Sequence, residues 1–310
     1  MFVRNFSRRG ASDGWIVQAP AKINLALEVL NRRHDGFHEV ETLLIPVRLF
    51  DTLRFRPSPE PLSLSIRSPS DAAESIPTDR RNLVVQAAER LAEVSGRPAT
   101  GRLELWKRIP SQAGLGGGSS DAAATLVAAN LAWQLGYSRQ RLASIAAEIG
   151  TDIPFFVHGG AALCSGRGEQ IESVGLPSGL PLVVARPPVG LSTPKVYSEL
   201  GLDRGQACDS TTEARWAGRC GKLVAALRSG APASSCKGYV RNSLQAAAEQ
   251  LTDWIGRLGH AFDQLPVLAH QMTGSGSAYF AICRTWKEAV WMAARLRGQH
   301  LQVVATRTCL

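Results

Sequence analysis

The chain has 310 residues and a formal net charge of +9, with 45% hydrophobic and 20% charged residues. The length suggests two domains or one large one, because single cores usually split beyond about 250–300 residues. No apolar run reaches the roughly 18 residues of a membrane span, so we expect no membrane partner. The basic residues are spread along the chain rather than gathered in blocks, which argues against a nucleic-acid partner and favours a small anionic ligand.

The six cysteines form no CxxC pair, and His34 and His38 lack the carboxylate of an HExxH motif. Zinc sites of these kinds are therefore not indicated. Residues 1–14 are basic but carry no apolar core, so they are no secretory signal. We expect a disordered tail or an early start codon there, with a short organellar leader as the alternative. The cysteines are then free thiols in a reducing compartment, and the predicted location is cytoplasmic.

Strands and helices interleave along the chain without a regular βαβ rhythm, which favours the α+β class. The first strand shows the period of a half-buried element, because Ile23, Leu25 and Leu27 alternate with polar residues and place Lys22 and Asn24 on one face. Clustered prolines predict a hinge over 177–188 between domains 15–176 and 177–310. The other predicted strands are 39–50, 102–108, 161–163, 182–185, 278–283 and 301–307, and the predicted helices are 83–94, 119–135, 139–149, 210–229, 244–258 and 287–298.

A glycine-rich turn stands between the strand predicted at 102–108 and the helix predicted from Ser119. It reads Gly114-Leu115-Gly116-Gly117-Gly118-Ser119-Ser120. Glycines let backbone N–H groups approach an anion closely, and a helix N-terminus adds donors and a positive dipole end. The turn has neither the Lys-Ser/Thr of a Walker A loop nor the spacing of a dinucleotide fingerprint. We interpret it as a phosphate-binding loop, in which Ser119 or Ser120 caps the helix or offers a hydroxyl to Mg²⁺.

Three segments in this order resemble the GHMP kinase superfamily. They are Pro20–Leu25 with Arg33–His38, Pro110–Ala123 followed by Asp152–Phe156, and Met272–Ser277. The resemblance implies an ATP-binding N-terminal domain of the ribosomal-S5-like type, a ferredoxin-like C-terminal domain and a cleft between them. Within the superfamily, PAKINL and DGFH point to the branch that phosphorylates the 2-hydroxyl of 4-diphosphocytidyl-2-C-methyl-D-erythritol in the non-mevalonate route to isoprenoids.

The resemblance also implies roles for individual residues. Lys22 and Asp152 are the catalytic pair, with Asp152 taking the hydroxyl proton and Lys22 stabilising developing charge. ATP is bound by Asn82, Leu83, Lys107, Pro110, Ser111, Gln112, Ala113, Gly114, Leu115, Gly116, Gly117, Gly118, Ser119 and Ser120, together with Mg²⁺. The acceptor substrate is bound by Asn24, Phe37, His38, Thr193, Tyr197, Gly274 and Ser275, with the rings of Phe37 and Tyr197 enclosing the cytosine.

Two departures from the family pattern concern the cytosine. Phe37 stands where tyrosine is usual, and Tyr197 stands where phenylalanine is usual, so stacking survives while a polar contact is lost. Two alternatives stay open: a GHMP kinase for mevalonate, homoserine or a sugar, and a catalytically silent ATP-binding relative. The segment 202–237 matches no part of the pattern. We expect a monomer or a weak homodimer.

Overall fold

The computed structural model describes residues 1–8, 11–68, 76–202, 219–229, 236–298 and 301–309. The chain divides into two compact units. Unit 1 comprises Met1–Ala21, Leu49–Pro110 and Gly116–Gly159, and unit 2 comprises Lys22–Arg48, Ser111–Leu115 and Gly160–Leu310. Strands β2 (Ala11–Arg32) and β3 (His38–Pro61) contribute residues to both units. This division differs from the prediction, which places a single boundary between residues 176 and 177.

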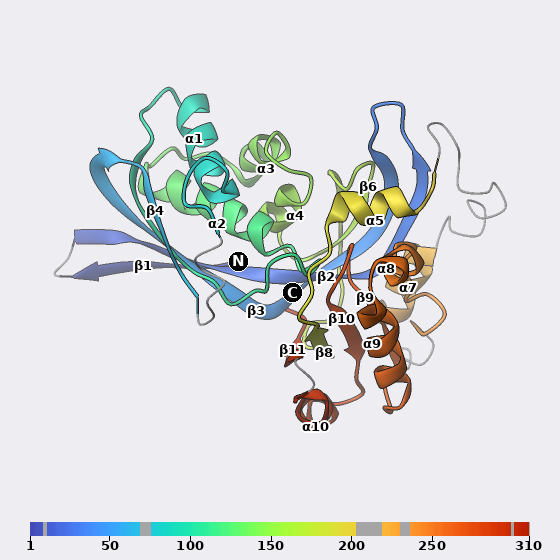
Figure 1. Ribbon diagram of the computed structural model, residues 1–310. Helices are drawn as coiled ribbons and strands as arrows, with labels where there is room; N and C mark the ends of the chain where they lie inside the picture. Colours follow the sequence, from blue (N-terminus) through green and yellow to red (C-terminus); the bar gives the residue numbers. More distant parts are fainter. Residues whose placement is uncertain (9–10, 69–75, 203–218, 230–235, 299–300, 310) are drawn as a thin grey trace. The chain divides into compact units, whose positions relative to one another are not determined.

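Unit 1 is a sheet with helices on one face (Figure 1). β3 pairs antiparallel with β5 (Thr100–Trp106), and β4 (Ser63–Arg67) pairs parallel with β5. The face is covered by α1 (Leu83–Val94), α2 (Gly117–Ala132), α3 (Arg139–Ala147) and α4 (Ile153–His158). Leu103 and Leu105 of β5 are buried, as the alternation in the sequence predicts.

The first strand of unit 1 corrects the prediction of a tail at residues 1–14. β1 (Phe2–Arg8) pairs antiparallel with β2, from Phe2 opposite Gln18 to Arg8 opposite Ala11. The rings of Phe2 and Phe50 lie 5.8 Å apart between centroids, and the Arg54 guanidinium lies 4.0 Å from the Phe6 ring. Phe2 and Phe6, four positions apart, thus act as strand residues, although the basic composition suggested disorder.

Unit 2 contains a four-stranded antiparallel sheet of order β11-β8-β10-β9. Its strands are β8 (Pro181–Arg186), β9 (Ala269–Met272), β10 (Tyr279–Ile282) and β11 (Gln302–Arg307). α9 (Asp253–Asp263) packs on β9 and β10, and α10 (Trp286–Leu296) packs on β8 and β11. With the last strand beside the first, this is the ferredoxin-like arrangement, so the fold predicted for the C-terminal part is confirmed.

The remaining elements of unit 2 lie around this sheet and at the start of β3. β6 (Ala161–Ser165) pairs with β3 and with β7 (Gln170–Val174). The helices are α5 (Thr193–Glu199), α7 (Arg219–Arg228) and α8 (Gln245–Leu251). Among the described residues, no helix combines the length and the apolar character that crossing a bilayer requires.

Several predicted boundaries differ from the structure. The predicted hinge at 177–188 contains β8, an inner strand of the sheet. The helix predicted at 244–258 is two helices, because Thr252 has φ −163° and ψ 136°, and its hydroxyl accepts a hydrogen bond from the Trp254 N–H at the start of α9. Of the helix predicted at 210–229, α7 is the described end, and residues 210–218 lie outside the described residues.

Candidate active site

Three sequence motifs meet in unit 2. The Lys22 N–H donates to the Leu115 carbonyl at 2.9 Å, which joins the first motif to the glycine-rich loop. The Ala278 N–H donates to the Ala113 carbonyl at 3.1 Å, and the Asn24 N–H donates to Thr273 Oγ1 at 2.9 Å. Each motif is therefore hydrogen-bonded to another, although about 250 residues separate the first motif from the last in the sequence.

Two glycines allow the loops of unit 2 to approach so closely. Gly114 has φ +71°, and a Cβ there would lie 2.2 Å from the Thr273 carbonyl oxygen. Gly274 has φ +56°, and a Cβ there would lie 3.0 Å from the Gly114 carbonyl oxygen and 3.2 Å from Lys22 Nζ. A side chain at either position would clash with backbone atoms of the other loop. Both positions therefore need glycine, for the close approach of the loops as well as for the positive φ.

The loop after β9 is held by residues that the sequence analysis missed. The carboxamide of Asn242 donates to the carbonyls of Met272 and Gly274 at 2.9 and 2.7 Å, and Gln245 Oε1 accepts from the Met272 N–H. The hydroxyl of Ser275 lies 2.7 Å from that of Thr193. Asn242 lies in a segment without helical or strand periodicity, so only its buried position in the tertiary structure identifies its role.

Lys22 is almost buried, with 5% of its surface exposed. Its ammonium donates to Asn24 Oδ1 at 2.7 Å, so the two polar residues predicted on one face of the strand do contact each other. An amide oxygen accepts a hydrogen bond and so fixes the direction of one N–H group of the ammonium. This geometry suits a lysine that stabilises negative charge on a reacting group.

The residues predicted to bind cytosine form a ring contact in unit 2 that differs in detail from the prediction. His38 and Tyr197 have ring centroids 4.8 Å apart, with 36° between the planes. Phe37 is 50% exposed, and the Arg167 guanidinium lies 4.7 Å from its ring centroid. Burial, and then the charge of Arg32, lowers the pKa of His38, so its imidazole is neutral at pH 7 with one donor and one acceptor.

In unit 1, Gly117 and Gly118 lie in the first turn of α2 rather than in a loop before it. The helix begins at Gly117, two residues earlier than predicted, and its N-cap Gly116 has φ +69°. Ser120 donates its N–H to the Gly116 carbonyl, which leaves the N–H groups of 117–119 as the helix-end donors. Neither serine is the N-cap. Ser120 is completely buried, whereas Ser119 is partly exposed.

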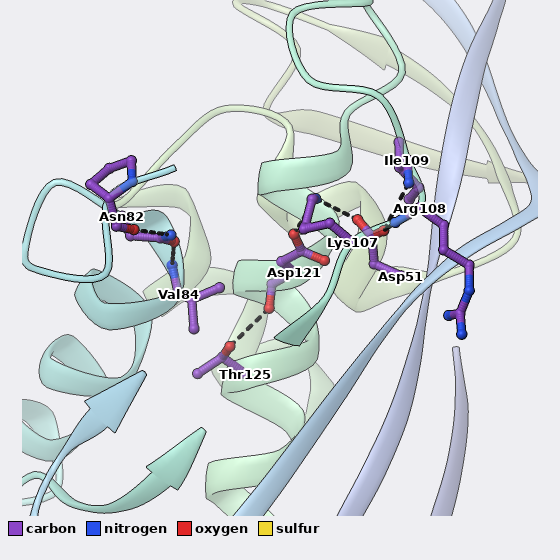
Figure 2. A network of polar contacts seen from close by, with 9 residues as sticks. Asp51, Asn82, Val84, Lys107, Arg108, Ile109, Asp121 and Thr125 are labelled. Carbon is purple, nitrogen blue, oxygen red and sulfur yellow. Dashed lines mark hydrogen bonds and ion pairs between the residues drawn. The ribbon is translucent and has the colours of Figure 1, made fainter. Parts of the chain in front are cut away.

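Beneath this turn, Lys107 forms a buried charged cluster with Asp51 and Asp121 (Figure 2). Its ammonium lies 2.6 Å from Asp121 Oδ2 and also bonds to Asp51. Asp51 also accepts from the N–H groups of Arg108 and Ile109. A Cβ on Gly117 would lie 3.3 Å from Lys107 Nζ, so the glycine leaves room for the ammonium. Through Asp121, just after the first turn of α2, the cluster ties the start of this helix to β3 and to the end of β5.

One ammonium faces two buried carboxylates, and the electrostatics follow from this imbalance. Burial alone lowers the pKa of Lys107, but the charges of Asp121 and Asp51 outweigh it and raise that pKa. Burial raises the pKa of Asp121 well above its usual range; Lys107 opposes this rise and Asp51 adds to it. A second buried negative charge is costly, so Asp121 retains its proton over a wider pH range than an exposed carboxyl.

Asn82 and Leu83, which were also predicted to bind ATP, have structural partners in unit 1 as well. Asn82 is the N-cap of α1: its Oδ1 accepts from the Val84 N–H, and its Nδ2 donates to the Pro77 carbonyl (Figure 2). Leu83 lies beside Gly118, where a Cβ would be 3.7 Å from Leu83 Cδ1. The structure thus brings Leu83 to the glycine turn, while the polar groups of Asn82 and Lys107 bond within the protein.

The rest of the glycine-rich segment and Asp152 have distinct positions. Pro110 ends one stretch of unit 1, and Ser111 and Gln112 are exposed in unit 2, where Gln112 has φ +52°. Asp152 is the N-cap of α4 in unit 1, with Pro154 in the first turn. Asp152 lies in the turn before α4, and its carboxylate makes no capping bond to that helix.

Comparisons with known proteins agree with this arrangement. The family "GHMP kinases N terminal domain" matches residues 82–160. A curated 4-diphosphocytidyl-2-C-methyl-D-erythritol kinase from Mycolicibacterium gilvum is 39% identical over 91% of this chain and 86% of its own length. One from Shouchella clausii is 38% identical over 94% and 93%.

Solved structures give the same fold. A crystal structure of 4-(cytidine 5'-diphospho)-2C-methyl-D-erythritol kinase has a TM-score of 0.74 and 32% identity, covering 94% of this chain and 98% of its own. A homoserine kinase from Cytophaga hutchinsonii has a TM-score of 0.76 at 20% identity, covering 99% and 98%, and shares the fold alone. The chain has the GHMP kinase fold and belongs to the 4-diphosphocytidyl-2-C-methyl-D-erythritol kinase family.

Proposed function

We propose that this protein transfers the γ-phosphoryl group of ATP to the 2-hydroxyl of 4-diphosphocytidyl-2-C-methyl-D-erythritol, in the cytoplasm. The observation that carries the proposal is the junction of three motifs in unit 2, where the ammonium of the nearly buried Lys22 donates a hydrogen bond to Asn24 Oδ1. Relatives with this name are 38–39% identical to the chain over more than nine-tenths of its length. The neutral His38 beside Tyr197 supports a base such as cytosine, which presents both donors and acceptors.

The proposed mechanism is direct transfer without a phosphorylated enzyme. Asp152 takes the proton of the acceptor hydroxyl, and Lys22 stabilises the charge on the transferring group. The N–H groups at the start of α2 bind phosphate oxygens, because a helix N-terminus provides donors and a favourable dipole. The catalytic contribution of the protein is mainly position and charge.

Mg²⁺ bound to ATP would neutralise phosphate charge. It usually keeps several waters and needs only one or two protein oxygens. Ser119 fits this need better than Ser120, since its side chain is partly exposed at the first turn of α2 while that of Ser120 is completely buried. Asp121 is 2% exposed and its Oδ2 bonds to Lys107, so we assign it to the cluster rather than to the metal.

The experiment combines purified protein, Mg·ATP and 4-diphosphocytidyl-2-C-methyl-D-erythritol, and follows ADP release and the phosphorus NMR of the product. We expect a new phosphomonoester signal. Asp152→Asn should lower kcat by at least about 10²-fold, because the general base is lost, and leave ATP affinity nearly unchanged. Near-normal turnover in that variant would contradict the role of Asp152.

The same assay separates the alternatives. Mevalonate, homoserine and sugars are tested as acceptors in parallel. Turnover with one of them alone would show that the protein is a kinase but that its substrate is not the one proposed. Binding of ATP without turnover on any acceptor would indicate a silent relative.

A further inference from the structure

A continuous chain of hydrogen bonds in unit 2 leads from a strand carbonyl to the Lys22 ammonium. Its members are Ala26, Thr42, Asn24, Thr273 and Lys22. The four polar side chains are between 0% and 5% exposed, so water does not compete for their bonds. Two strands and the loop after β9 contribute to the chain, which therefore exists only in the folded unit.

The hydroxyl of Thr42 determines which way the Asn24 carboxamide faces. Thr42 Oγ1 donates its one proton to the Ala26 carbonyl at 2.7 Å. It can then only accept from Asn24, whose Nδ2 lies 2.8 Å away. Amide nitrogen and oxygen are otherwise easily exchanged in a structure, but here the proton count excludes the flipped orientation. The amide nitrogen must face Thr42, and the oxygen must face the other way.

Thr273 fixes the same residue from the opposite side. Its Oγ1 accepts the Asn24 backbone N–H at 2.9 Å, which leaves its own proton for Asn24 Oδ1 at 3.3 Å. Oδ1 thus accepts from Thr273 and, at 2.7 Å, from the Lys22 ammonium. Both acceptor positions of this oxygen are occupied by the protein, so the oxygen of Asn24 acts toward Lys22.

We propose that Thr273 and Thr42 are positioning residues that lock the Asn24 carboxamide with its oxygen toward Lys22. The inference deepens the proposed function and rests on it, since there Lys22 stabilises the transferring phosphoryl group. A flipped amide would present N–H groups to an ammonium, which repels it. Gly274 completes the arrangement, because a side chain there would approach Lys22 Nζ to 3.2 Å.

The kinetic test uses isosteric substitutions. Thr273→Val and Thr42→Val should each lower kcat by about tenfold to a hundredfold, because small misplacement of a catalytic group is costly, with the KM for ATP changed less than about twofold. Thr273→Ser and Thr42→Ser should restore most of the rate. The matched control is Thr306→Val, a buried threonine of β11 whose hydroxyl has no hydrogen-bond partner among the described residues, and it should keep wild-type activity.

A double-mutant cycle distinguishes positioning from a general structural effect. If Thr273 acts through Lys22, Thr273→Val should lower kcat no further in a Lys22→Met background. A full additional loss in that background, or wild-type kcat in both valine variants, would overturn the proposal.

A second readout does not depend on the acceptor. In protein carrying ¹⁵N-labelled lysine side chains, the Lys22 signal, assigned by its loss in Lys22→Met, should shift in Thr273→Val and Thr42→Val but stay in place in Thr306→Val. An unmoved Lys22 signal in both valine variants would refute the positioning role. A moved signal in a protein without kinase turnover would refute the proposed function and leave the positioning role standing.

Discussion

Tyr197 and His38 illustrate at the residue scale how the structure refines an expectation taken from a family. The resemblance paired Phe37 with Tyr197 around a cytosine, whereas the ring in contact with Tyr197 is His38. Phe37 directly precedes His38 in the chain, but its ring contacts the Arg167 guanidinium, which lies 4.7 Å from the ring centroid. The enclosure of cytosine by Phe37 and Tyr197 stays a prediction, and His38 has the polar atoms to recognise the base edge.

Tyr197→Ala should raise the KM for the cytidine-bearing acceptor by about fivefold or more, because stacking of a base on an aromatic ring contributes about 1–3 kcal/mol. The KM for ATP should not change. Tyr197→Phe keeps the ring and should behave like the wild type. Steady-state kinetics with each substrate varied in turn checks this, and an equal effect of both variants would argue that the hydroxyl, not the ring, is what binds.

At the scale of elements, the buried cluster of Lys107, Asp51 and Asp121 explains how the start of α2 is kept in place. Glycines form helices poorly, by about 1 kcal/mol each relative to alanine, so a helix that begins with two of them needs other support. The support is ionic and comes from β3 and the end of β5 (Figure 2). It has a pH dependence, because the two carboxylates cannot both be neutralised by one ammonium.

Asp121→Asn should change how stability varies with pH. The folded protein raises the pKa of Asp121, chiefly by burial, so its contribution to stability is fully present below the ordinary carboxyl pKa of about 3.9. That contribution is lost as pH rises through the raised value. The free energy of unfolding of the wild type should therefore fall relative to Asp121→Asn from about pH 4 upward. Urea unfolding at a series of pH values measures it.

The control for that series is Asp253→Asn, which replaces a carboxylate whose side chain is 88% exposed. Its pH dependence should follow the wild type. Parallel curves for the wild type and Asp121→Asn would show that folding does not shift the pKa of Asp121.

At the scale of the whole molecule, the described cysteines report on unfolding. Cys164, Cys220, Cys236 and Cys283 are buried, and Cys309 is partly buried. Burial, and then Glu288, raises the pKa of Cys283 to about 12, and burial, with Glu41 next, raises that of Cys220 as well. Thiolate is the reactive form, so both thiols are protected by their protonation as well as by burial.

Alkylation with iodoacetamide at pH 8 should therefore leave Cys220 and Cys283 unmodified in the native protein and modify both in concentrated urea. Peptide mass spectrometry locates the labels. Labelling of Cys283 in native protein as fast as in urea would contradict its place in the core. Cys208 lies outside the described residues, and we make no prediction for it.

The sequence by itself determined the elements whose pattern is local. Helix α1 has the predicted bounds, and the strands at 102–108, 278–283 and 301–307 appear with small shifts. Periodicity identifies these elements because one face of each is buried. The glycine-rich segment 114–118 is also evident from the sequence, because four of its five residues are glycine. Even the contact between Lys22 and Asn24 follows from the two-residue period of a strand.

Only the tertiary structure decided which partners these residues find. Thr273, Thr42 and Asn242 gain their roles from bonds to residues 18 to 249 positions away, and no local pattern records such a distance. Lys107 looked like a ligand residue and is held by two buried carboxylates, while residues 2–8 looked disordered and pair with β2. Local sequence preferences determine which secondary structure a segment forms. The role of each side chain is determined by the buried polar groups from distant segments that it contacts.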